Sequence, residues 1–164
     1  MPLSFRNLAI ILLVLFGLLW WMLGGDPEEE VRAAHTELLE QIIKTDDETA
    51  PALLLKARAL ADLFADPIEV SGTAEGMAGI YSPEELGNLI VRLRTVFDTI
   101  ELTFSELAIE FPSDENAIVR FSAALDGQTR IAGDQGRFEE RSVTTRLRLT
   151  GGDWLFTEIE LEGL

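Results

Sequence analysis

The pattern of apolar and polar positions divides the chain into three regions. Residues 8–23 form an uninterrupted run without any charged side chain. Between Glu28 and Phe97, three stretches (28–43, 53–64 and 86–97) carry apolar residues at every third or fourth position, which is typical of amphipathic helices. From Asp98 onward apolar and polar residues alternate, which is typical of strands with one buried face. The chain therefore begins with a segment long enough to approach membrane thickness, followed by helices and then by a sheet.

Three helices are predicted in the middle region. The first runs from Glu28 to Ile43. The second follows a polar break at 44–51, carries its apolar face as far as Phe64, and ends at Asp66-Pro67 because the residue before proline avoids helical geometry. The third begins with the capping-box sequence 82–85. Its buried face consists of Leu86, Leu89, Ile90, Leu93 and Phe97, and Arg92 and Arg94 are expected to face solvent.

The alternating region predicts four long antiparallel strands. The phase of the alternation slips between Phe104 and Leu107, so an extra residue near Ser105-Glu106 is expected to form a β-bulge. The turn at 151–153 allows two registers for the last hairpin. We prefer a three-residue loop, because it places Arg146 opposite Glu158; a two-residue loop would set Arg148 against Leu155. Residues 68–70 predict one further short strand, and 72–79 a glycine-containing loop.

This order of elements predicts an α+β fold, with three helices packed on one face of a curved antiparallel sheet. The segments Leu60–Val70, Tyr81–Leu86 and Thr150–Leu155 resemble the NTF2-like superfamily (nuclear transport factor 2, ketosteroid isomerase and SnoaL-type cyclases). The resemblance covers about residues 28–162. It implies a cone-shaped domain with a cavity between the helices and the concave side of the sheet.

The first region predicts a single-span membrane anchor at residues 1–25, followed by an acidic domain at 26–164. Arg6 precedes the apolar run, and four acidic residues follow it closely. Basic residues stay on the cytoplasmic side, so we expect a cytoplasmic N-terminus and a periplasmic domain at a bacterial inner membrane. A cleaved signal peptide is the alternative. Cleavage after Gly24 or Gly25 would place Met22 or Leu23 where signal peptidase requires a small residue.

Two small residues in the apolar run, Ala9 and Gly17, are eight positions apart. They lie on nearly the same helical face, and small residues let helices approach closely in lipid. The anchor is therefore expected either to pack against another membrane helix through this face or to act as a passive tether in the bilayer.

Charge and composition exclude several kinds of partner and cofactor. The predicted domain holds all 29 acidic residues against 12 basic ones, which gives it a net charge of −17. Such a surface repels nucleic acid and anionic lipid headgroups, so we expect no nucleic-acid partner. The absence of cysteine excludes disulfides and zinc–thiolate sites, and the acidic runs lack the ligand spacing of a calcium loop. We expect no metal and no cofactor.

His35 and Tyr81 are the candidate residues of the implied cavity. They are the single histidine and the single tyrosine of the chain. A histidine can titrate near neutral pH, but a buried histidine in a helix is commonly a hydrogen-bonded core residue. Tyr81 precedes the third helix and is placed either in the cavity or at its mouth. Cyclases of the superfamily carry an acid or base near the end of the last strand, where Glu158 and Glu160 are expected to face outward here. No catalytic residue is therefore assigned.

These observations favour a non-catalytic interaction module that serves as an accessory subunit of a larger membrane complex, such as a secretion, respiratory or photosynthetic complex. A homo-oligomer is compatible with this interpretation. The alternative is a carrier of a small apolar ligand, or an isomerase-like enzyme that uses the cavity. Two or more polar groups converging in a dry pocket would favour the alternative. An interior filled by Phe64, Phe97, Phe104 and Phe121 would favour the interaction module.

Overall fold

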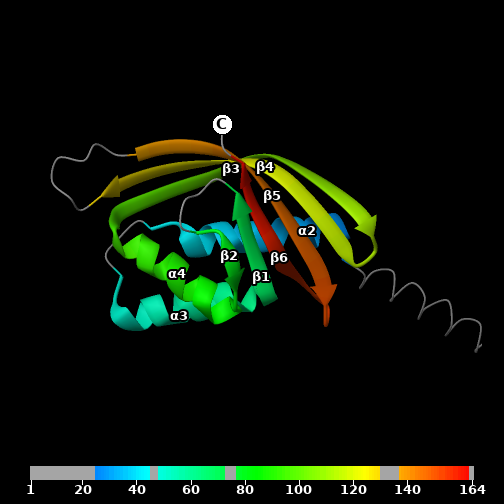
Figure 1. The fold of residues 1–164 in the computed structure, drawn as a ribbon, viewed down its shortest axis with the longest axis horizontal. Coiled ribbons are helices and arrows are strands. Elements are labelled where there is room, and N and C mark those ends of the chain that lie inside the picture. The colour runs from blue at the N-terminus through cyan, green and yellow to red at the C-terminus, as the bar shows by residue number, and fades with distance from the viewer. Residues whose placement is uncertain (1–24, 45–47, 73–76, 130–136, 163–164) are drawn as a thin grey trace, which may run out of the picture. The chain divides into compact units, whose positions relative to one another are not determined.

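A computed structural model describes residues 25–44, 48–72, 77–129 and 137–162 (Figure 1). These residues contain three helices and six strands. The chain divides into two units, Met1–Glu30 and Val31–Leu164. The architecture described below is that of the second. The predicted anchor at 8–23, with Ala9 and Gly17, lies outside the described residues. Within those residues, no helix is long and apolar enough to cross a membrane.

The helices are α2 (Pro27–Ile42), α3 (Ala50–Asp62) and α4 (Pro83–Thr95). The predicted capping box of α4 is confirmed. The Ser82 hydroxyl accepts a hydrogen bond from the Glu85 amide at 3.3 Å, and the Glu85 carboxylate accepts one from the Ser82 amide at 2.9 Å. These two bonds satisfy amide groups that the first helical turn leaves without partners.

The six strands form one mixed sheet in the order β2-β1-β6-β5-β4-β3. β1 pairs with β6 in parallel, and all other neighbours are antiparallel. The predicted α+β class is confirmed, but the sheet is larger than expected because β1 and β2 extend it beyond β6. Their bounds, in chain order, are β1 Phe64–Gly72, β2 Gly79–Tyr81, β3 Phe97–Ser113, β4 Asn116–Thr129, β5 Arg137–Thr150 and β6 Asp153–Glu162.

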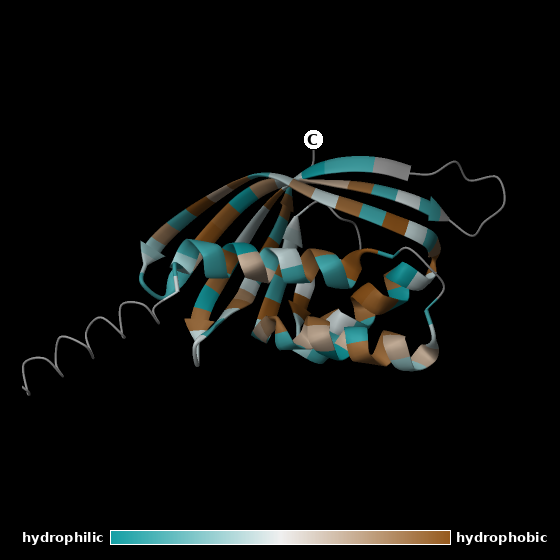
Figure 2. Cartoon of the chain, turned by 180° about the vertical axis from the view of Figure 1, so that it is seen from behind, coloured by the Kyte–Doolittle hydropathy of each residue, from teal (hydrophilic) through white to brown (hydrophobic). Residues whose placement is uncertain are grey.

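The helices cover one face of the curved sheet and leave the other face without a helix (Figures 1 and 2). Apolar side chains from both layers meet between them and form a single core. Its most deeply buried members, each below 4% exposed, are Val31, Leu60, Phe64, Ile68, Leu86, Ala117, Val119, Leu147 and Phe156. These residues belong to α2, α3, α4 and four of the strands, so the core joins every layer of the domain.

The predicted end of the second helix is wrong. α3 ends at Asp62, and Phe64, Asp66 and Pro67 all belong to β1. The Phe156 amide of β6 donates to the Leu63 carbonyl at 2.9 Å, so pairing with a strand distant in sequence begins where the helix ends. Phe64 remains buried, but as a strand residue. Phe97 likewise begins β3 instead of ending α4.

The predicted bulge in β3 is confirmed. Ser105 pairs with Ser122, and the next registered pair is Ala108 with Arg120. Glu106 has a positive φ of 58°. The shift in register keeps apolar residues on the helix-covered face on both sides of the bulge.

The predicted loop of the last hairpin is wrong, although the pairing that motivated it is present. Thr150 pairs with Asp153 across the two-residue turn Gly151-Gly152, and Arg148 faces Leu155. A second irregularity then shifts the register, so Arg146 pairs with Glu158 after all. The sequence pattern thus indicated the correct ion pair, but the extra residue lies in the strand at Thr157 and not in the turn.

Candidate functional site

His35 lies on the face of α2 that packs against the sheet, and both of its ring nitrogens are hydrogen bonded. Nδ1 lies 2.9 Å from the Val31 carbonyl oxygen, and Nε2 lies 2.9 Å from the Thr145 hydroxyl oxygen. A carbonyl can only accept, so Nδ1 carries the proton and Nε2 accepts from the hydroxyl. Both His35 and Thr145 are almost fully buried, at 2% and 1% exposed.

Two phenylalanines enclose the His35 ring. Phe121 of β4 and Phe156 of β6 approach it edge-on, with centroids 5.4 and 4.9 Å away. Burial lowers the pKa of His35, an effect that the hydrogen bond to Val31 opposes only in part. The imidazole is therefore neutral at physiological pH. It has the environment of a core histidine that supports α2 on the sheet.

Tyr81 lies in a different part of the domain. It belongs to β2, at one edge of the sheet, and pairs with Ile68 of β1. Its hydroxyl donates to the Met77 carbonyl at 2.8 Å. His35 lies instead against β4, β5 and β6, so the two candidate residues do not converge on one site.

Several phenylalanine side chains contribute to the core between the helices and the sheet. The Phe64 and Phe156 rings are 6.3 Å apart, and the Phe104 and Phe121 rings 4.6 Å apart. Phe64, Phe121 and Phe156 are buried, and Phe104 packs against the same core. Phe97 is half-buried, and a Cβ at Gly127 would lie 2.8 Å from its ring.

Arg94 is the clearest error of the sequence interpretation. The periodicity of the helix predicts that Arg94 faces solvent like Arg92. Arg92 is exposed as predicted, but Arg94 is only 1% exposed. Its Nε donates to the Ile42 carbonyl, and its Nη2 donates to the Ile43 carbonyl, each at 2.9 Å. Arg94 of α4 therefore caps the C-terminal end of α2.

Glu48 links this arginine to α3. Its Oε1 lies 3.0 Å from Arg94 Nη2 and 2.8 Å from Lys56 Nζ. Partial burial raises the pKa of Glu48, but the hydrogen bonds and charges of Lys56 and Arg94 outweigh that effect, so the pKa lies below its usual value. Glu48 Oε2 and Arg94 Nη1 are buried without a hydrogen-bond partner. This cluster joins the ends of three helices, which is a structural role.

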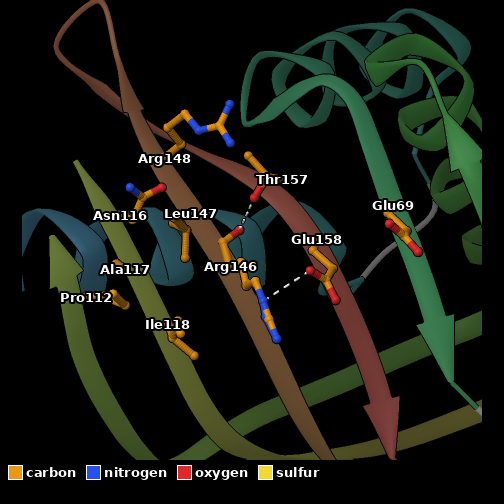
Figure 3. A pocket seen from close by; sticks show the side chains of 10 residues that line it. All are labelled: Glu69, Pro112, Asn116, Ala117, Ile118, Arg146, Leu147, Arg148, Thr157 and Glu158. Atoms are coloured by element: carbon orange, nitrogen blue, oxygen red, sulfur yellow. Dashed lines mark hydrogen bonds and ion pairs between the residues drawn. The ribbon is translucent and has the colours of Figure 1, made fainter.

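A pocket of about 330 Å³ lies on the face of the sheet away from the helices (Figure 3). Leu147 points into the core, so its neighbours Arg146 and Arg148 point outward. Glu158 lies on the same side as Arg146, because the two residues are registered partners and form an ion pair. The pocket is lined by Glu69, Pro112, Asn116, Ala117, Ile118, Arg146, Leu147, Arg148, Thr157 and Glu158.

Charged and amide groups dominate the pocket. Arg146 Nε lies 3.1 Å from Glu158 Oε2, and the Thr157 hydroxyl donates to the Arg146 carbonyl at 3.1 Å. Asn116 pairs with Arg148 across the strands, and its amide donates to the Ser113 hydroxyl. The pairing of Arg146 with Glu158 is the one feature of this pocket that the sequence analysis predicts. Within the described part of the chain, no three His, Asp or Glu side chains cluster closely enough to hold a metal ion.

The fold is shared with solved structures of low sequence identity. No protein-family model and no curated protein sequence matches the chain. A proposed scytalone dehydratase from Novosphingobium aromaticivorans is similar, with a TM-score of 0.67, 16% identity, and 82% of this chain and 81% of that chain covered. The hexachlorocyclohexane dehydrochlorinase LinA-type3 from Novosphingobium barchaimii has a TM-score of 0.64 and 16% identity, with 82% of this chain and 84% of that chain covered. A proposed dehydratase of the NTF2-like family from Streptomyces avermitilis has a TM-score of 0.61 and 11% identity, with 83% of this chain and 94% of that chain covered.

The fold of this domain is NTF2-like. The similarity holds for the arrangement of helices and strands, as the resemblance in the sequence implied. At these identities it says nothing about which residues act, because one fold carries many unrelated activities.

Proposed function

We propose that this chain is a non-catalytic interaction module, carried on an N-terminal membrane anchor and acting as an accessory subunit of a larger membrane complex. The observation that carries the proposal is the state of His35. Its two ring nitrogens are bonded to Val31 and Thr145, and its ring is enclosed by Phe121 and Phe156. A base in this state is not available to a substrate.

The pocket on the helix-free face supplies the docking surface in this proposal. It presents Arg148 and Asn116 beside the Arg146–Glu158 ion pair. Polar, charged surfaces of this kind give specificity and steer association. A partner segment carrying a carboxylate opposite Arg148 would be complementary to it.

Co-purification of the tagged full chain in mild detergent tests the proposal. Arg148→Glu reverses a charge in the pocket, so partners should be lost. Arg120→Glu is the matched control, because Arg120 lies on the same face but outside the pocket and pairs with Glu110 at 2.8 Å. Loss of the same partners in both variants, or in neither, would contradict docking at the pocket.

The anchor and its orientation are tested separately. Protease should digest the domain in spheroplasts but not in intact cells, if the chain spans the inner membrane with the domain outside the cytoplasm. A soluble form appearing without added protease would instead indicate a cleaved signal peptide. Replacing residues 8–23 by an unrelated apolar span shows whether Ala9 and Gly17 mediate helix packing, because a passive tether would leave co-purification unchanged.

A second candidate is a carrier or lyase for a small apolar molecule. It is favoured by the similarity in fold to the dehydratases and the dehydrochlorinase. Thermal-shift titration with small apolar compounds distinguishes the two. A saturable rise in melting temperature would favour the second candidate.

A further inference from the structure

The pocket on the helix-free face of the sheet holds an unpaired charge at each of its two ends. Arg148 on β5 and Glu69 on β1 both line the pocket, and both are exposed. Arg146 and Glu158 lie between them and form an ion pair with each other, as Figure 3 shows. Within the described part of the chain, neither the Arg148 nor the Glu69 side chain takes part in a hydrogen bond or an ion pair. The pocket is therefore positive at one end and negative at the other.

Each unpaired charge has a neighbour of the same sign. Glu69 is registered with Glu158 on the adjacent parallel strand, so two carboxylates lie side by side on one face of the sheet. Arg148 follows Arg146 by two positions on β5, so both side chains project from the same side of the strand. Like charges at neighbouring positions of a sheet repel each other. The Arg146–Glu158 ion pair relieves part of each repulsion, but it leaves Glu69 and Arg148 without a counter-charge among the described residues.

The strand geometry sets the separation of the two unpaired charges. β5 and β1 are the two neighbours of β6, so two strand spacings, about 9.6 Å, separate them. Glu69, Glu158 and Arg146 lie in one row across these strands, and Arg148 lies about 6.6 Å further along β5. The backbone positions of Glu69 and Arg148 are therefore about 12 Å apart. In an extended peptide, residues four positions apart face the same side and span about 13 Å, which matches this separation.

We propose that the pocket binds an extended partner segment that carries an acidic residue and, four positions away, a lysine. The acidic side chain binds Arg148, and the lysine lies between Glu69 and Glu158. A guanidinium group presents a planar fork that matches a carboxylate, whereas an ammonium group is a compact charge that can approach two carboxylates from different strands. Two contacts of opposite sign also fix the direction in which the segment crosses the pocket. This inference rests on the proposed function, because it specifies the partner of the same pocket.

A second copy of this chain would also present one charge of each sign, but its remaining surface is unfavourable. Around the pocket, the same face of the sheet carries further acidic residues on β3 and β6, namely Glu101, Glu110, Glu160 and Glu162. Each chain also has a net charge of −16. Two such faces repel each other, so the charges favour a partner that is not itself acidic.

Charge reversal at the two ends of the pocket tests the proposal on the tagged full chain in mild detergent. Arg148→Glu and Glu69→Lys should each lower the recovery of the co-purifying partner at least about tenfold, because an attraction becomes a repulsion. Glu101→Lys is the matched control for Glu69→Lys. Glu101 is exposed on the helix-free face but lies on β3, outside the pocket, so its reversal should leave recovery unchanged. Unchanged melting temperatures show that the variants are folded.

Carbodiimide crosslinking of the purified complex identifies the groups that meet at each end of the pocket. The carbodiimide activates a carboxylate, a lysine amine in contact with it displaces the activating group as a urea, and an amide bond forms. In the wild-type complex, Glu69 should become joined to a lysine of the partner. In Arg148→Lys, which keeps the positive charge, position 148 should become joined to an aspartate or glutamate four residues from that lysine. Mass spectrometry of the crosslinked peptides reads both positions.

The outcomes separate this inference from the proposed function. Loss of the partner in Arg148→Glu but not in Glu69→Lys would leave docking at the pocket standing and overturn the segment of two opposite charges. Full recovery in both variants would contradict the proposed function as well. Crosslinks from positions 69 and 148 to unrelated parts of the partner would also overturn the inference. So would a crosslink between an isotope-labelled and an unlabelled copy of this chain in a mixture of the two, because the occupant would then be a second copy.

Discussion

Arg94 and Lys44 cap the ends of each other's helices. Arg94 of α4 donates to the carbonyls of Ile42 and Ile43 at the end of α2. Lys44, just beyond α2, donates through Nζ to the Phe97 carbonyl at 2.6 Å and approaches the Arg94 carbonyl at 3.5 Å. Arg94 thus satisfies carbonyl groups at the end of α2, and Lys44 satisfies one in the last turn of α4 and one just beyond it, where the helix dipoles also favour positive charge.

Replacement of Arg94 by methionine should destabilise the domain by about 3 kcal/mol. Methionine keeps the aliphatic volume but leaves the two α2 carbonyls and the Glu48 carboxylate without their buried donor. Urea unfolding measures the loss. Arg92→Met is the control, because Arg92 is exposed and its replacement should change stability by less than about 0.5 kcal/mol. Equal effects of the two substitutions would contradict the capping role.

Glu48 should make the stability of the domain depend on acidic pH. Its pKa in the folded state lies below the usual 4.5, so it binds protons more readily when the chain is unfolded. The stabilisation that the ionised Glu48 carboxylate contributes is therefore complete above about pH 4.5. It is lost as the pH falls through the lower pKa of the folded state. The difference in unfolding free energy between wild type and Glu48→Gln should shrink across this range. A difference independent of pH would show that the carboxylate charge is not responsible.

The parts of the fold that depend on local sequence were predictable. The capping box of Ser82 and Glu85 and the bulge near Glu106 each follow from a few neighbouring residues. The parallel pairing of β1 with β6 was not predictable, since it joins segments far apart in the chain. For the same reason the periodicity wrongly extended the second helix to Phe64. An apolar residue such as Phe64 is compatible with a buried position in a helix or in a strand, so it cannot mark the boundary between the two elements.

The sequence was least informative about charged residues. Arg94 and Arg92 are two positions apart on one helix, and nothing in their neighbours distinguishes the buried one from the exposed one. Arg94 is buried because the ends of α2 and α3 happen to meet there. His35 was predictable as a core histidine from its position beside Val31 and Leu38. Its partner Thr145 is 110 residues away and carries no signal of that role.

The losses caused by removing either partner of the His35–Thr145 hydrogen bond should not add fully when both partners are removed. His35→Leu leaves the Thr145 hydroxyl buried without a partner, and Thr145→Val leaves Nε2 without one, each at about 1–3 kcal/mol. The double variant replaces both polar groups by apolar ones. Its loss should be smaller than the sum of the single losses by about 1 kcal/mol. Strict additivity of the unfolding free energies would mean that the two side chains do not interact.

His35 should make the unfolding free energy depend on pH a second time, near neutrality. Burial lowers the pKa of His35 below 6.5, so protons bind preferentially to the unfolded chain as the pH falls. The stability that depends on the neutral ring is complete above about pH 6.5 and declines toward the folded-state pKa. Between pH 7.5 and pH 5.5, the unfolding free energy should fall more in wild type than in the His35→Leu, Thr145→Val double variant. Equal losses would assign the pH dependence to other groups.

Gly87 sets how closely α3 and α4 pack. It is buried in the middle of α4, and a Cβ at this position would lie 2.6 Å from the Ala57 carbonyl oxygen of α3. Alanine normally favours a helix over glycine by about 1 kcal/mol, so in isolation Gly87→Ala would stabilise α4. Here the clash is with backbone, which cannot move aside cheaply, and we expect a net loss of about 1–3 kcal/mol. Asn88→Ala, at the next and exposed position, provides the control and should be neutral or stabilising. A higher melting temperature for Gly87→Ala would show that α3 and α4 can separate enough to accept the methyl group, and that their close packing is not required for stability.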